Sequence, residues 1–162
     1  MLAASALAAC SPSQPASAQK PADAAKPITW TIAPVSGLPG VGKTVNVRID
    51  AKLQGGWHIY SITQPAGGPI ATRITLPAGQ PFTLASAPKP TVQPEIKFDE
   101  AFRMNVQLHA KAVGFTVPVR LARATPAPDS IRVNVRYQVC NASLCYPPQT
   151  AKLAAPVSSK AR

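Results

Sequence analysis

Apolar and polar residues alternate along the chain from about residue 28 onward. The clearest case is residues 130–139, in which every second side chain is apolar and those between are polar. A period of two over this length, rich in β-branched residues, predicts a strand with one buried face. Similar short segments, separated by turn residues, lie at residues 28–35, 44–53, 56–61, 70–76, 81–85, 104–112, 114–121 and 150–154.

These segments together predict an all-β fold. No stretch shows sustained apolar residues at the helical spacings of three and four. Eight or nine short strands at this spacing indicate one sandwich or barrel domain. We expect an immunoglobulin-like β-sandwich over residues 28–155, followed by a tail at 156–162. The composition agrees, because only 14% of the residues are charged while 19 are Pro and 9 are Gly.

One motif suggests a different function. Residues 37–44, GLPGVGKT, match the phosphate-binding pattern G-x-x-x-x-G-K-[ST]. Such a loop needs a helix directly after it, whose free N–H groups hold the phosphates. Residues 45–53 alternate with a period of two instead, so we expect the motif to be a Gly/Pro turn that leads into a strand.

The N-terminal residues point to export. Residues 1–10, MLAASALAAC, resemble the end of a bacterial lipoprotein signal, where small residues precede a cysteine that is lipidated. We therefore expect Cys10 to be a lipidation site, and residues 11–27, rich in Pro, Ala and Ser, to be a disordered tether. The alternatives are an ordinary cleaved signal or a chance Ala-rich tail. The expected location is the periplasm, with membrane attachment only through the lipid.

The charge balance is strongly basic but not informative by itself. Lys and Arg number 17 against 6 acids, a formal charge of +11. Such a surplus serves nucleic acid, an anionic membrane surface or an acidic protein partner. The basic residues are scattered singly, without a basic run or an RNA-binding aromatic motif, so we expect no nucleic-acid partner.

Cys140 and Cys145 form a close pair in the segment YQVCNASLCYPPQT. Four residues separate them, close enough for a disulfide if the loop curls back. A ring this small restricts the unfolded chain little, so its disulfide contributes little to stability. This favours a redox role for the pair. A structural disulfide and a metal site remain alternatives, although tetrahedral zinc wants four ligands and the chain has two histidines, His58 and His109.

A thiol that attacks a disulfide must be partly deprotonated, which a nearby cation favours. Arg136 lies four residues before Cys140 on the polar face of the expected strand, and it is the candidate cation. The alternative is an ordinary solvated arginine.

The cysteine segment resembles that of the N-terminal periplasmic domain of DsbD, the thiol:disulfide interchange protein of Gram-negative bacteria. GGWHIYS is similar to the aromatic strand of that family, and FDEAF to the loop that shields its cysteines. The likeness covers roughly residues 28–154. It implies an immunoglobulin-like sandwich whose cysteine pair relays electrons from a thioredoxin-like domain towards periplasmic oxidoreductases.

The resemblance also implies roles for individual residues. Cys145 forms the mixed disulfide with the partner and Cys140 resolves it. His58, Tyr60 and Tyr146 belong to the motifs around the sulfurs. The cap loop contains Asp99, Glu100 and Phe102, with Phe102 as the shield and Phe98 as the alternative. The cysteine spacing is one residue shorter than in the best-known family members.

The expected function is therefore thiol-disulfide interchange with thioredoxin-like proteins, as a component of a protein-disulfide reductase. No cofactor or metal is implied. The 162 residues carry neither the membrane domain nor the thioredoxin-like domain of full-length DsbD. The electron donor therefore stays open, and a membrane protein is one candidate. The alternative function is a lipoprotein binding module with a small structural disulfide.

Overall fold

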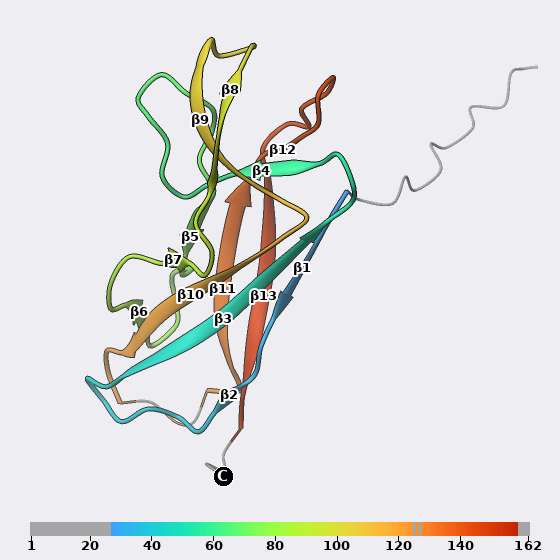
Figure 1. Cartoon of the computed structure of the whole chain (residues 1–162). Helices are drawn as coiled ribbons and strands as arrows, with labels where there is room; N and C mark the ends of the chain where they lie inside the picture. The colour runs from blue at the N-terminus through green and yellow to red at the C-terminus, as the bar shows by residue number, and fades with distance from the viewer. Residues whose placement is uncertain (1–26, 125, 127, 159–162) are drawn as a thin grey trace, which may run out of the picture.

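The computed structural model describes residues 27–124, 126 and 128–158, and these residues form an all-β structure (Figure 1). The expected lipidation site Cys10, residues 11–26 of the expected tether and the end of the tail lie outside the described residues. Within the described part, no helix is long and apolar enough to cross a bilayer. The strands are β1 (Ile28–Ile32), β2 (Val35–Ser36), β3 (Thr44–Leu53), β4 (His58–Tyr60), β5 (Arg73–Thr75), β6 (Phe82–Leu84), β7 (Lys89–Pro90), β8 (Glu95–Asp99), β9 (Met104–Ala110), β10 (Ala112–Leu121), β11 (Ser130–Tyr137), β12 (Val139–Cys140) and β13 (Gln149–Ser158).

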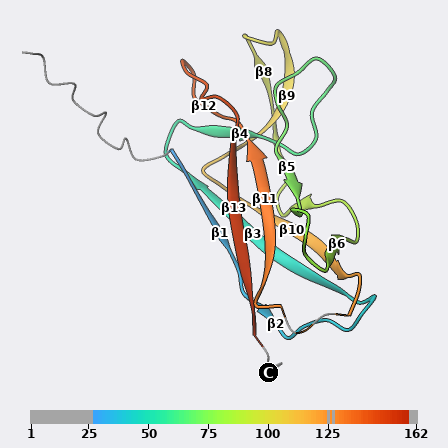
Figure 2. The ribbon, with the colours of Figure 1, turned by 180° about the vertical axis from the view of Figure 1, so that it is seen from behind.

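Two sheets form the body of the molecule. One has the order β1-β3-β10-β6, with β7 also paired to β10, and the other has the order β2-β13-β11-β5. Figure 2 shows the second sheet from the opposite side to Figure 1. The inward residues of both sheets belong to a single buried cluster, to which β3 contributes Val47 and Ile49 and β11 contributes Val133 and Val135. This arrangement confirms the expected immunoglobulin-like β-sandwich.

A third sheet stands at one end of the sandwich, with the order β12-β4-β9-β8 (Figure 1). The β8–β9 hairpin projects beyond the sandwich body in both ribbon views. Beneath it lies a second, smaller buried cluster of Tyr60, Val106, Leu108 and Cys140, with Met104 packed against it. The cysteine pair therefore sits on a small core of its own rather than in the main one.

The strand pattern differs from the expectation in several places. The strand β13 runs to Ser158, beyond the expected end of the domain at residue 155. The segment 28–35 is not one strand, because β1 and β2 join different sheets and the chain between them contains Pro34, which has no N–H to donate. Similarly, β11 ends at Tyr137 and β12 begins at Val139, so the strand expected at residues 130–139 is interrupted at Gln138. Finally, β7 and β8 had no periodic signal, and the total exceeds the eight or nine strands expected.

The GLPGVGKT segment is a loop that leads into β3, as expected. Its Gly37 and Gly42 adopt positive φ angles of 76° and 79°, which glycine tolerates at turns. The N–H of Lys43 donates to the carbonyl of Gly40, and the chain then extends as a strand. The helix that a phosphate-binding loop requires is therefore replaced by β3.

Candidate functional site

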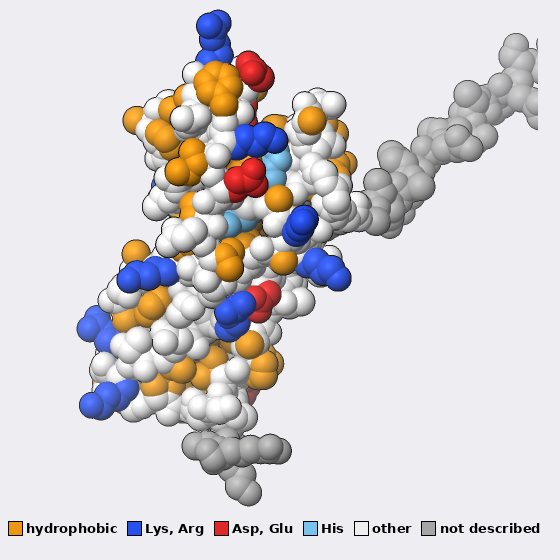
Figure 3. Space-filling view, in the orientation of Figure 1, with side chains coloured by type: hydrophobic (Ala, Val, Ile, Leu, Met, Phe, Trp, Pro, Cys, Tyr) orange, Lys and Arg blue, Asp and Glu red, His pale blue; other side chains and the backbone are white. Residues whose placement is uncertain are grey.

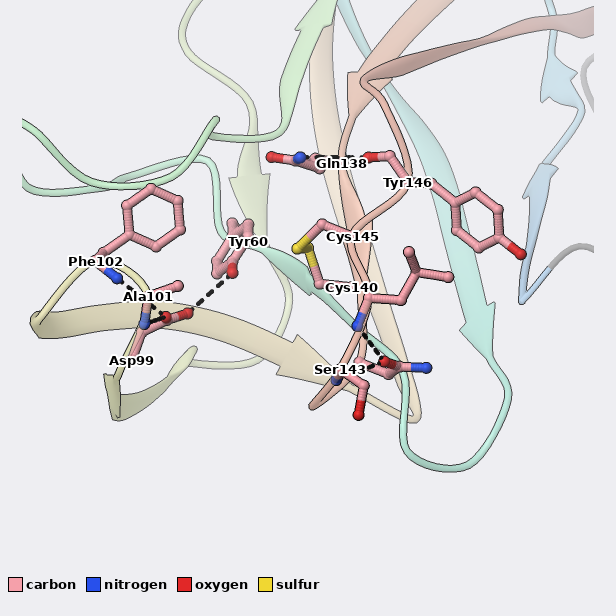
Figure 4. Close-up of a disulfide and its surroundings, with 11 residues drawn as sticks. Tyr60, Asp99, Ala101, Phe102, Gln138, Cys140, Ser143, Cys145 and Tyr146 are labelled. Atoms are coloured by element: carbon pink, nitrogen blue, oxygen red, sulfur yellow. Dashed lines mark hydrogen bonds between the residues drawn. A yellow bond between two sulfur atoms is a disulfide. The ribbon is translucent and has the colours of Figure 1, made fainter.

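The two cysteines are joined in a disulfide at the tip of a tight hairpin (Figure 4). Their Cα atoms are 4.1 Å apart, and Cys140 and Cys145 face each other as an isolated antiparallel bridge. The Asn141 side chain shapes the ring, since its Oδ1 accepts the N–H groups of Ser143 and Leu144 at 2.9 and 2.8 Å. The Asn141 N–H in turn donates to the Leu144 carbonyl at 2.8 Å. These hydrogen bonds support the shape of the ring in addition to the disulfide.

Cys140 and Cys145 differ sharply in their exposure to solvent. Cys140 ends β12 and is only 1% exposed, because it packs with Tyr60, Val106 and Leu108. Cys145 lies on the outer limb of the hairpin and is exposed. Thiol exchange requires an in-line approach to the attacked sulfur. Cys145 is thus the accessible member of the pair and Cys140 the sheltered one.

Aromatic and acidic residues face the disulfide from the other strands of the third sheet. The buried Tyr60 of β4 donates its hydroxyl hydrogen bond to Asp99 Oδ2 at 3.0 Å. The Tyr60 ring meets that of Phe102 edge-on, with centroids 6.2 Å apart. Figure 4 shows Phe102 and Tyr60 on the same side of the disulfide. Burial raises the pKa of the Tyr60 hydroxyl, and the Asp99 hydrogen bond acts in the same direction, so this hydroxyl stays a donor.

Asp99 also builds the turn that carries Phe102. Its Oδ1 accepts the N–H of Ala101 at 2.9 Å and that of Phe102 at 3.4 Å. Arg103 then takes a positive φ of 53°, which directs the chain back into β9. One carboxylate therefore connects the β8–β9 turn to Tyr60, and through Tyr60 to the base of the site.

A hollow of about 370 Å³ separates the disulfide hairpin from the β8–β9 hairpin. Most of the residues expected from the sequence line it, together with several that were not expected. The lining includes His58, Tyr60, Asp99, Glu100, Phe102 and Cys145 among the expected residues, and Lys97, Val106, Leu108, Asn141 and Leu144 among the others. Phe98, the alternative shield, also borders the hollow, but its side chain is 52% exposed against 37% for Phe102.

His58 occupies the row of the sheet next to Cys140. Its backbone lies opposite Cys140 on one side and Ala110 on the other. Its ring meets Tyr60 edge-on at 5.2 Å. Burial lowers the pKa of His58 and the charge of Lys97 acts in the same direction, while Asp99 and Glu95 oppose the shift. In Figure 3 an acidic and a basic side chain lie beside a histidine in the upper part of the molecule.

Two expected residues lie away from the hollow. Arg136 is exposed on β11, opposite Arg73 of β5 and Thr150 of β13, and does not line the hollow. Tyr146 follows Cys145, but its ring turns outward (Figure 4) and stacks on Trp57 with centroids 5.4 Å apart. The side chain of Tyr146 thus anchors the exit of the ring, while its backbone N–H donates to the Val139 carbonyl at 3.0 Å.

The site contains no arrangement suited to a metal. Among the described residues, no group of three or more His, Cys, Asp or Glu side chains converges as metal ligands would. His109, the second histidine, lies in β9 opposite Ile59, and its Nε2 is 3.3 Å from the hydroxyl of Ser61.

Removing the disulfide is expected to leave the domain folded. The double variant Cys140→Ser/Cys145→Ser loses a ring worth about 2 kcal/mol in the chain-entropy account, while the sandwich core is untouched. We expect one cooperative thermal transition at a somewhat lower midpoint, measured by circular dichroism. Loss of the cooperative transition would show that the domain requires the disulfide to fold.

Acid is expected to destabilise the fold through its two histidines. Burial lowers the pKa of both His58 and His109 below 6.5 in the folded protein, so the unfolded chain binds more protons in acid. Stability rises with pH wherever the unfolded state binds more protons. This contribution is complete above about pH 6.5 and is lost as the pH falls through the folded pKa values.

Denaturant titrations between pH 5 and 7.5 measure how steeply the free energy of unfolding rises with pH. We expect this rise to be smaller in His109→Gln. An unchanged rise in that variant would contradict the assignment to histidine burial.

Residues 29–156 match the family described as the N-terminal part of the thiol:disulfide interchange protein DsbD. Comparison with curated protein sequences finds no significant match.

Among solved structures, the N-terminal periplasmic domain of ScsB from Proteus mirabilis is similar, with a TM-score of 0.52 and 16% identity, over 80% of this chain and 45% of that one. The reduced DsbD N-terminal domain of Neisseria meningitidis aligns with a TM-score of 0.49 and 16% identity, over 68% of this chain and 76% of that one.

Proposed function

The chain belongs to the family of the N-terminal domain of the thiol:disulfide interchange protein DsbD, and from this premise we propose that it relays electrons through Cys140 and Cys145. In the proposed reaction the dithiol form reduces a disulfide in a thioredoxin-like protein and is itself oxidised to the bridge described above. A separate donor then reduces the bridge again. The chain thereby acts as a component of a protein-disulfide reductase.

The observation that carries the proposal is that the two cysteines of the disulfide differ in solvent exposure. Cys140 is 1% exposed while Cys145 is open to the hollow. A relay needs one thiol that meets the partner and a second that waits close by, out of reach of other thiols. The Cα atoms of the pair are 4.1 Å apart, so the second thiol needs no large movement to resolve a mixed disulfide.

The reaction proceeds in two exchanges. The Cys145 thiolate attacks one sulfur of the partner disulfide, so a Cys145–partner bond forms and the partner's other sulfur leaves as a thiolate. Cys140 then loses its proton and attacks the Cys145 sulfur, which expels the first partner sulfur as a thiolate. Two electrons pass from the cysteine pair to the partner, and each expelled thiolate takes up a proton.

The partners are proposed to be thioredoxin-like proteins of the periplasm. The ScsB domain that resembles this chain in fold is itself a periplasmic domain. Disulfides persist in such oxidising compartments, which fits a chain whose described cysteines are bonded. Attachment to a membrane through Cys10 and the Pro/Ala-rich tether remains part of the proposal.

A stoichiometric transfer experiment tests the function. The reduced chain is mixed with an equal amount of an oxidised thioredoxin-fold protein, the reaction is quenched with acid, and free thiols are labelled with a mass-shifting maleimide. We expect thiols to disappear from the chain as they appear in the partner within minutes. If the chain stays reduced while dithiothreitol reduces the same partner, the disulfide is structural and the binding-module alternative holds.

A further inference from the structure

His58 carries a buried polar atom with nothing to bond to. Its Nε2 is shielded from solvent, and the described residues provide it no hydrogen-bond partner. A buried polar group left unpaired costs free energy, because it has given up its hydrogen bonds to water. Such atoms are uncommon in native proteins, and a redox or catalytic role is one of the recognised reasons for keeping one.

The position of His58 indicates which group could bond to its Nε2. His58 lies directly opposite Cys140 in the β4–β12 ladder, and Cys140 lies opposite Cys145. Residues directly opposite in an antiparallel ladder share a face, with Cβ atoms about 4.5–5.5 Å apart. The side chains of His58 and Cys140 therefore leave the sheet from adjacent rows on the same face. In the disulfide the Cys140 sulfur has no proton to give, whereas reduction creates a thiol at the same place.

We propose that His58 is the proton acceptor for the Cys140 thiol in the resolving exchange. The inference rests on the proposed function, because it concerns the second step of that reaction. The Cys140 S–H proton passes to Nε2 as the Cys140 sulfur attacks Cys145. The Cys145–partner bond breaks, its electron pair leaves with the partner sulfur, and the imidazolium releases its proton to that thiolate or to water.

The burial of Cys140 makes a proton acceptor necessary. A thiol packed among Tyr60, Val106 and Leu108 is a poor source of thiolate, because its surroundings disfavour the charge. Water reaches it poorly, since the residue is 1% exposed. His58 is the base in the adjacent row of the sheet, and a general base must lie within hydrogen-bond reach of the proton that it removes.

The charged neighbours of His58 come from β8, and Tyr60 lies on its own strand. Lys97 favours the neutral imidazole, whereas Asp99 and Glu95 favour the protonated one. Tyr60 is uncharged, because burial raises its pKa. From β9 the opposite residue is Ala110, which does not titrate, and from the disulfide hairpin the opposite residue is Cys140. Burial outweighs the two carboxylates, so the imidazole is neutral and ready to accept a proton.

The two exchanges can be timed separately with 5,5′-dithiobis(2-nitrobenzoate) under stopped flow. The reduced chain releases one coloured thiolate when Cys145 attacks and a second when Cys140 resolves the mixed disulfide. We expect His58→Phe to slow the second release roughly a hundredfold at pH 7, within the usual range for a general base. The first release is expected to stay unchanged. The deficit should shrink towards pH 9, as hydroxide takes over the role of the base.

Two further variants make the experiment specific. His58→Gln keeps a polar group but cannot carry the proton, so it is expected to be as slow as His58→Phe. His109→Gln removes the other buried histidine and is expected to leave both releases unchanged. If either His58 variant folds and keeps the wild-type rate and pH profile of the second release, the inference is wrong. If the wild-type chain gives no second release, the proposed function fails, and this inference with it.

Discussion

The Cys140→Ser variant is expected to accumulate a stable mixed disulfide with an oxidised thioredoxin-fold protein, and Cys145→Ser at least about tenfold less. The reason is the exposure of the two residues. Cys145 lies at the surface beside the hollow, so it can reach a partner sulfur. Without Cys140 nothing resolves the adduct. In Cys145→Ser the remaining thiol is 1% exposed and meets the partner rarely.

Trapping is measured on non-reducing gels after alkylation, with the double serine variant as the background. Thermal unfolding of both single variants checks that each is folded. Equal trapping by the two variants would contradict the assignment of roles. Trapping by Cys145→Ser alone would reverse it, with Cys140 as the partner-facing thiol.

Phe102→Ala is expected to speed reduction of the disulfide by glutathione roughly threefold to tenfold, because access to the attacked sulfur controls such exchange. Phe102 lines the hollow with Cys145, and its ring rests edge-on against Tyr60, with centroids 6.2 Å apart. Replacing the ring by a methyl group opens that side of the disulfide. The rate is followed by trapping free thiols over time at fixed pH and glutathione concentration.

Phe98→Ala is the matched control, because it removes the same ring from the same hairpin. The Phe98 side chain is 52% exposed and no ring contact holds it against Tyr60 among the described residues. We expect its rate to match the wild type. A gain in Phe98→Ala alone would move the shield to Phe98, and equal rates in all three proteins would leave the disulfide without an aromatic shield.

Much of the sandwich could be predicted because strands such as β3 and β11 alternate. In β11 every second residue is buried, and in β3 every second residue from Val47 onward is buried. This pattern is visible in the sequence without any knowledge of the neighbouring strands. The strand β8 could not be predicted in this way. None of its residues is fully buried, and Ile96 and Phe98 are exposed, so no burial pattern marks it as a strand. Its pairing with β9, rather than its own sequence, makes it a strand.

The candidate site could be predicted only in part. The cysteines are close in sequence, so their pairing was accessible, but the Tyr60–Asp99 hydrogen bond joins residues 39 positions apart. Only the family resemblance predicts that Tyr60 and Asp99 belong to the same site. Leu144 and Asn141 were missed, although Asn is a known former of tight turns through its side chain.

Arg136 is close to Cys140 in sequence, but the sheet geometry explains why it does not line the hollow. Four residues of extended chain span roughly 13 Å, so a cation at that spacing is distant from the sulfur. Its side chain belongs to the outer face of the sandwich sheet, opposite Arg73. Spacing along a strand is therefore a poor guide to which charges surround a site at its end.

Equilibration of the chain in glutathione buffers, with acid quenching and thiol labelling, tests the central claim most directly. If Cys140 and Cys145 relay electrons, the pair interconverts with glutathione, and its reduction potential falls between about −270 and −120 mV, the range of dithiol oxidoreductases. The domain stays folded in both forms. A pair that remains oxidised in every such buffer, with a potential below about −300 mV, would be a structural disulfide and would contradict the account.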